Sequence, residues 1–102
     1  MSLMEKIKVV MDLFSDVAMR LDIAQTITFL FDVYSHGKAN EDQIRDDLFD
    51  LFLTLANVAR PDLLPEERKK IASQLTEDFM NTFKLEGARR RMMSKYRLAV
   101  SV

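Results

Sequence analysis

Several residue types are absent or scarce in this chain of 102 residues. It has no cysteine and no tryptophan, one histidine, two glycines and two prolines. The lack of cysteine excludes disulfides, thiolate metal sites and a cysteine nucleophile. So few glycines and prolines leave too little turn material for an all-β fold. No apolar run approaches the roughly 18 residues that cross a bilayer, and none forms a signal peptide, so we expect a cytoplasmic protein without a membrane partner.

The composition is typical of a soluble globular protein. Hydrophobic residues make up 48% of the chain and charged residues 30%, both ordinary values. We expect one domain spanning residues 1–102. The formal net charge is −1, but residues 1–64 have an excess of five acidic residues and residues 65–102 an excess of four basic ones. The two parts could attract each other, or the second could attract a polyanion.

Apolar residues near the N-terminus recur every three or four positions, which places them on one face of an α-helix. The pattern predicts a first helix over residues 3–20 and a second over residues 23–34. Asp22 and Gln25 have the spacing of a capping box, so we expect a break or sharp kink near residues 20–22. Nothing in the sequence settles whether these two helices are continuous. The stripe consists of Leu3, Ile7, Val10, Phe14, Val17, Leu21 and Ala24.

The boundaries of the next helices are marked more clearly. Gly37 can end the second helix, and Asn40 with Gln43 predicts a capping box at the start of a third helix over residues 41–59. This third helix is apolar almost all round from Leu48 onward. Such a helix is normally central in a bundle or buried on two sides. We therefore expect it to be the hydrophobic centre, or to be buried partly against a second subunit.

The last part of the chain predicts one or two further helices. Pro65 suits the first turn of a fourth helix, and Ile71, Leu75, Phe79 and Phe83 form its inner stripe. Gly87 either stops this helix or loosens it, and a basic helical segment follows over residues 88–98. The sequence therefore predicts an all-α fold, a compact bundle of four or five antiparallel helices.

Two charged clusters are candidate interaction sites. A basic patch near the C-terminus predicts contact with nucleic acid or another anionic surface, unless its apolar residues dock on the bundle and leave the cations in water. An acidic stripe on the third helix repeats at four-residue spacing, so its charges repel one another. We hypothesise that residues 89–97 face this stripe, within the chain or across a dimer. The basic patch is Lys84, Arg89, Arg90, Arg91, Lys95 and Arg97; the acidic stripe is Asp42, Asp46, Asp47 and Asp50.

Other functional patterns are weak. Residues 17–25 resemble the turn of a helix-turn-helix motif, but Asp22 stands where glycine is usual and residues 23–34 carry no Lys or Arg. His36 is expected to cap a helix end rather than to act as an acid or base. No phosphate loop, zinc motif or nucleophile elbow is present. We therefore expect no enzyme activity, no metal, no cofactor and no small-molecule substrate.

The pattern as a whole favours a non-enzymatic module for protein–protein interaction or assembly. We expect it to associate with itself, as a dimer, or with another protein, because the third helix is apolar on two sides and the first could pack like a coiled coil. The alternative is a small nucleic-acid-binding or accessory protein that acts through the basic C-terminal segment. The candidate oligomer seam on the first helix is Ile7, Val10, Phe14 and Val17.

Overall fold

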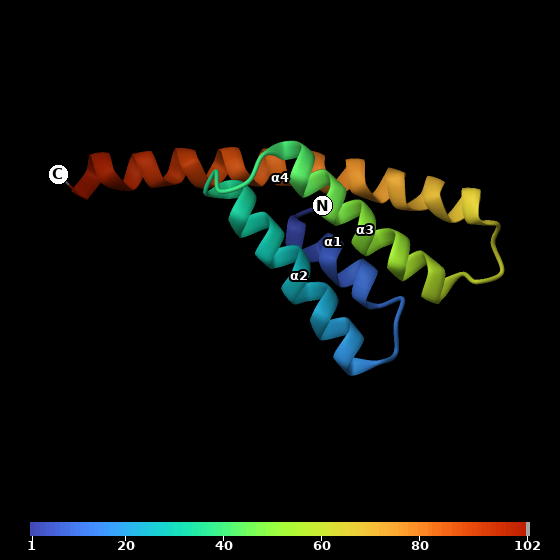
Figure 1. Ribbon diagram of the computed structural model, residues 1–102. Helices are drawn as coiled ribbons and strands as arrows, with labels where there is room; N and C mark the ends of the chain where they lie inside the picture. Colours follow the sequence, from blue (N-terminus) through green and yellow to red (C-terminus); the bar gives the residue numbers. More distant parts are fainter. Residues whose placement is uncertain (102) are drawn as a thin grey trace.

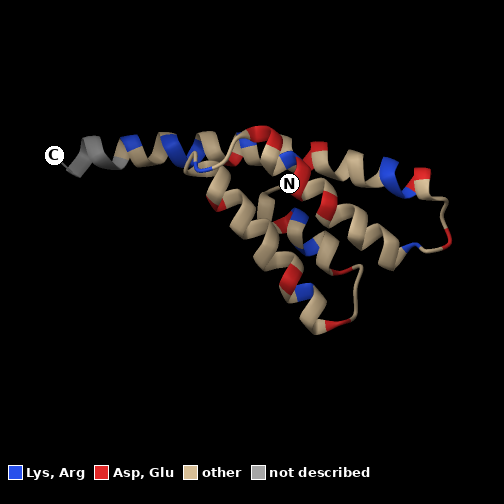
Figure 2. Cartoon of the chain, viewed as in Figure 1, with Lys and Arg blue, Asp and Glu red and all other residues tan. Residues whose placement is uncertain are grey.

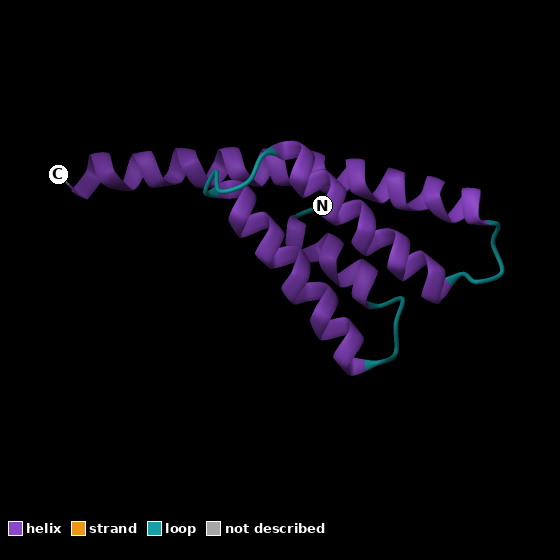
Figure 3. Cartoon of the chain, in the orientation of Figure 1, coloured by secondary structure: helices purple, strands orange, loops and turns teal. Residues whose placement is uncertain are grey.

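The computed structural model describes the backbone of residues 1–101 and the side chains of residues 1–96. The described chain is all-helical and contains no strand (Figures 1 and 3), which confirms the predicted fold class. There are four helices. They are α1 (Leu3–Met11), α2 (Val17–Ser35), α3 (Glu41–Ala59) and α4 (Pro65–Ser101).

The break between the first two helices lies earlier than predicted. α1 ends at Met11, and α2 begins after Asp16, whose carboxylate accepts a hydrogen bond from the Met19 backbone N–H at 3.0 Å. Arg20, where the break was expected, instead donates to the carbonyl oxygens of Met11 (2.8 Å) and Phe14 (3.0 Å). These carbonyls lie at the end of α1 and in the following loop, where the helix supplies no further backbone N–H groups as hydrogen-bond donors. Arg20 thus satisfies the end of one helix from within the next.

This earlier break changes which apolar residues are buried. Leu3, Ile7, Val10 and Phe14 lie in the core, as expected from the spacing. Val17 now begins a different helix, and 78% of its surface is exposed. The stripe therefore ends at Phe14, because a helical pattern cannot continue across a loop. The resemblance to a helix-turn-helix is also wrong, since residues 17–25 all lie inside α2 without a turn.

The junction between α2 and α3 forms as predicted. Gly37 has a φ of +67°, and its N–H and that of Lys38 bond back to the carbonyls of Tyr34 and Val33 at 3.1 and 3.0 Å, the pattern of a Schellman motif. Asn40 and Gln43 form the predicted capping box of α3. His36 is the C-terminal cap of α2, and its Nδ1 donates to the Asp32 carbonyl at 2.7 Å.

The longest helix departs most from expectation. α4 starts at Pro65 as predicted, but it passes through Gly87 and continues to Ser101 as one helix of 37 residues. Residues 88–98 are thus the continuation of the fourth helix and not a fifth one. Gly87 is buried at this point, and a Cβ there would lie 3.4 Å from the ring of Tyr34. The glycine therefore allows the close approach of α2 rather than a helix end.

The core is organised around α2 and α4, which corrects the expectation that the helix over residues 41–59 is the centre. α2 and α4 each pack against all three other helices, whereas α3 packs only against α2 and α4 among the described residues. Phe83 of α4 stacks on Phe31 of α2 with ring centroids 5.2 Å apart, and Phe79 stacks on Phe52 of α3 at 5.0 Å. The second apolar side of α3, with Phe49 and Leu53, is only half-buried.

Candidate functional site

The C-terminal part of α4 projects beyond the other helices (Figure 1). At 1.5 Å per residue, α4 is about 55 Å long and α3 about 28 Å, and the longest dimension of the molecule is 58 Å. α3 begins beside α4 at the ion pair between Glu41 and Lys84, with 2.7 Å between Oε1 and Nζ. Residues 88–101, which we call the arm, extend past this point, so α3 does not accompany them.

The arm carries an exposed apolar face. Leu85, just before the arm, is 70% exposed, Met92 66% and Tyr96 65%. Their spacing of seven and four residues puts all three on one side of the helix. That side is opposite to Phe79 and Phe83, which face the core. The apolar face of α4 therefore changes sides near residue 84, and the outer face has no neighbour in the described chain.

Two cations of the basic patch are used inside the chain. Lys84 pairs with Glu41, and this hydrogen-bonded contact lowers the pKa of Glu41 and raises the pKa of Lys84. Arg90 pairs with Asp32 at 3.0 Å, and its guanidinium lies over the Phe31 ring, 4.6 Å from the centroid. These two contacts fasten the base of the arm to α2 and α3.

The other basic residues are presented to solvent. Arg89, Arg91 and Lys95 are exposed, and Arg91 and Lys95 form no ion pair with any part of the chain whose side chains are described. The side chain of Arg97 lies outside the described residues. The projecting arm therefore combines an apolar face with several Lys and Arg residues, which are blue in Figure 2.

The acidic stripe is not neutralised by the basic patch of its own chain. Asp42, Asp46, Asp47 and Asp50 are all exposed on α3. Asp42 pairs with Arg45 of the same helix at 3.5 Å, and Arg45 also pairs with Glu77 at 2.7 Å, but Arg45 does not belong to the basic patch. From the contact between Glu41 and Lys84, the stripe runs one way and the arm the other, because the two helices are antiparallel there (Figure 2). The hypothesis that residues 89–97 face the stripe within one chain is therefore wrong for this structure.

The candidate seam on the first helix is not a continuous outer face. Ile7, Val10 and Phe14 are buried inside the chain against the other helices, and Val17 lies on α2. Their periodicity reflects packing within the chain. A partner could reach the three buried residues only if α1 moved away from the bundle.

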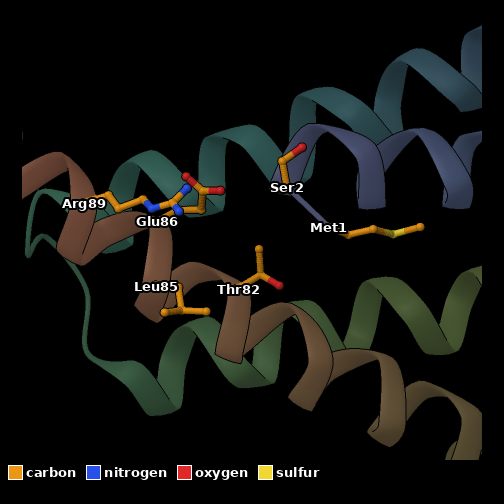
Figure 4. A pocket seen from close by; sticks show the side chains of 6 residues that line it. All are labelled: Met1, Ser2, Thr82, Leu85, Glu86 and Arg89. Carbon is orange, nitrogen blue, oxygen red and sulfur yellow. The ribbon is translucent and has the colours of Figure 1, made fainter.

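A cavity of about 300 Å³ lies at the base of the arm (Figure 4). The side chains of Arg89 and Glu86 lie alongside each other at one end of it, and Ser2 and Thr82 contribute hydroxyls. No histidine lines this cavity. It is lined by Met1, Ser2, Thr82, Leu85, Glu86 and Arg89.

The described residues offer little else for chemistry. No group of three or more His, Asp or Glu side chains among them is placed to hold a metal ion. Within the same part of the chain, no helix has the length and apolar composition needed to cross a lipid bilayer.

The outer apolar face of Leu85, Met92 and Tyr96 is not among the sequence predictions, which place a basic patch on this segment and let its apolar residues dock on the bundle. The spacing of Leu85, Met92 and Tyr96 is a signal that could have revealed the face. Comparison with known family models, with curated protein sequences and with solved structures found no match for this chain.

Proposed function

We propose that this protein is a non-enzymatic, self-associating helical module, in which a bundle of four antiparallel helices holds out the arm as the element of association. The observation that carries this proposal is the exposed face of Leu85, Met92 and Tyr96 on the outer side of α4. Burying a large apolar side chain contributes about 1.5–3 kcal/mol. Docking this face on another surface would therefore be favourable.

The length of the arm supports the same conclusion. Helical segments shorter than roughly 12–15 residues are marginal in water, and most helices in proteins owe their stability to packing. The arm, residues 88–101, has a length in this marginal range. Among the described side chains, it contacts the bundle at its base, through Arg90. A partner surface would supply the missing packing. Because the arm belongs to every copy of the chain, a symmetric dimer is the simplest assembly.

A second candidate function is binding of nucleic acid by the arm. Arg89, Arg91 and Lys95 are exposed beside Tyr96, and cations interleaved with an aromatic ring suit phosphates and bases respectively. The acidic face of α3 opposes such binding, since a polyanion would have to avoid it. We therefore place this function second.

Light scattering at two salt concentrations, with and without a mixed-sequence oligonucleotide, separates the two functions. We expect the wild-type chain to be dimeric without the oligonucleotide. The variant M92Q/Y96Q should be monomeric, whereas L21Q/F29Q, which replaces two exposed apolar residues of α2, should remain dimeric. A wild-type monomer that binds the oligonucleotide in a salt-sensitive way would favour the second function. A monomer that binds nothing would contradict both.

A further inference from the structure

We propose that the arm of one copy docks in the groove between α3 and α4 of a second copy, and that the second copy docks its own arm in return. This inference rests on the proposed self-association and names the surface that receives the arm. The groove holds a cavity of about 230 Å³ lined by Arg45, Asp46, Phe49, Ser73, Thr76 and Glu77.

The groove offers both of the chemical features that the arm needs. Asp46 and Asp50 lie four residues apart on α3 and are exposed. Phe49 and Leu53, also four residues apart, form a neighbouring apolar row that is only half-buried in the single chain. This row belongs to the second apolar side of α3. The groove thus has an acidic row beside an apolar row, and Arg45, its one lining cation, is paired with Glu77 and Asp42.

The arm has the complementary arrangement. Arg91 and Lys95 form a basic row at four-residue spacing, and Met92 and Tyr96 form an adjacent apolar row at the same spacing. A four-residue step rises about 6 Å on both helices, so the two cations of the arm have the same spacing along the helix axis as the two carboxylates of α3. Going around the arm in the direction of the chain, the basic row comes just before the apolar row. Going around α3 in the same direction, the acidic row comes just after the apolar row. When two such helices lie face to face and run parallel, the basic row meets the acidic row and the two apolar rows meet each other.

A two-fold axis perpendicular to α4 produces this parallel orientation of the arm and the partner's α3. α3 is antiparallel to α4 in each copy, as the pairs of Glu41 with Lys84 and Arg45 with Glu77 require. An arm parallel to the partner's α3 is therefore antiparallel to the partner's α4, which is the relation that a perpendicular two-fold axis imposes. If the axis passes near residue 84, Arg91 lies opposite Glu77 and Lys95 opposite Ser73. Both of those residues line the groove.

The same symmetry accounts for Leu85. With the axis near residue 84, the two copies of Leu85 meet close to the axis, and its 70% exposed side chain becomes covered. The dimer interface then contains a central apolar contact, with the basic row of each arm against the acidic row of the other copy on either side. Such charge complementarity sets the register and orientation of an interface more than its affinity.

Charge reversal with complementation tests the proposal. D46K/D50K makes the groove basic and R91E/K95E makes the arm acidic, so each variant alone should dissociate about tenfold or more readily than the wild-type chain. Mixed together, the two variants should form a heterodimer, because each arm then meets a groove of opposite charge. Sedimentation velocity measures the dimer fraction of each sample, and circular dichroism checks that both variants remain helical.

Matched controls separate a specific contact from a change in net charge. D22K/E67K and K38E/K70E change the net charge equally at exposed positions outside the acidic stripe and the arm, and both should dimerise as the wild-type chain does. Dimers that are unaffected by D46K/D50K but lost in M92Q/Y96Q would overturn the groove while leaving self-association in place. Failure of the two charge-reversed variants to associate on mixing would also overturn it. A wild-type chain that is monomeric would contradict the proposed self-association itself.

Discussion

The two parts of α4 show how one helix can serve two purposes. Over residues 65–87 its inner face is buried, with Ala72, Phe79, Met80 and Phe83 almost inaccessible to solvent. Over residues 88–101 there are five Lys or Arg and no Asp or Glu, and the large apolar side chains that are described are exposed. The backbone is continuous, so the difference comes from the neighbours. The first part stabilises the fold, and we propose that the second part recognises a partner.

The largest expected difference between the two parts concerns apolar truncation. Phe83→Ala should lower the free energy of unfolding by about 3–5 kcal/mol, because it leaves a cavity beside Phe31. Met92→Ala removes an exposed side chain and should change it by no more than about 0.5 kcal/mol. Urea unfolding at low protein concentration measures both. Comparable losses in the two variants would show that the arm is packed in the monomer.

Deleting the end of the arm should affect assembly and leave the fold almost intact. A chain ending at Arg91 keeps the contacts of Arg90 with Asp32 and Phe31. We expect its unfolding free energy, measured at low concentration, to lie within about 1 kcal/mol of the wild-type value. Light scattering should give the molecular mass of a monomer for this truncated chain. A truncated chain that still dimerises would place the interface on the bundle.

Two adjacent arginines near the base of the arm differ in whether they contact the bundle. Arg90→Gln removes a cation–π contact and a partly exposed ion pair, and should cost about 1 kcal/mol of stability. Arg91→Gln, which changes an exposed residue, should cost almost nothing in the monomer. Thermal unfolding of the two variants at low concentration makes this comparison. Equal effects would mean that the base of the arm is not fastened by Arg90.

The smallest expected effect is the pH dependence of the pair formed by Glu41 and Lys84. The pKa of Glu41 is lowered below its ordinary value of 4.5 by the hydrogen bond from Lys84. Its contribution to stability is therefore present above that value and is lost as the pH falls through the lowered pKa. Glu41→Gln should reduce the loss of stability between about pH 5 and pH 3. Urea unfolding across this range tests it, and an unchanged slope would contradict it.

The sequence predicted the helices because their periodicity and caps are local. Gly37, Asn40 and Pro65 end or begin helices as expected, since each acts on the backbone next to it. The break after Met11 was placed wrongly because Asp22 and Gln25 have the spacing of a capping box, whereas α2 is capped by Asp16, another residue type that favours this position. The contact of Arg20 with the Met11 carbonyl, nine residues back, supports the earlier break but leaves no local pattern in the sequence.

The candidate site was predicted only in part for a similar reason. Composition revealed the basic patch and the acidic stripe, because charge can be counted along the chain. It could not show that α4 continues through Gly87, since glycine permits either a helix end or a close approach, and the ring of Tyr34 decides which occurs. That continuity sends the arm away from the stripe of its own chain. For this reason we propose a contact between two chains in place of the contact within one chain.

Amide hydrogen exchange as a function of protein concentration tests the central claim most directly. At low concentration, residues 91–96 should exchange far faster than residues 72–83, because local stability follows packing. As the concentration rises and dimers form, protection should increase in residues 91–96 and on the α3 side of the groove around Phe49, and remain unchanged at Phe83. Protection of the arm that is independent of concentration, whether high or low, would contradict its assignment as an element of association.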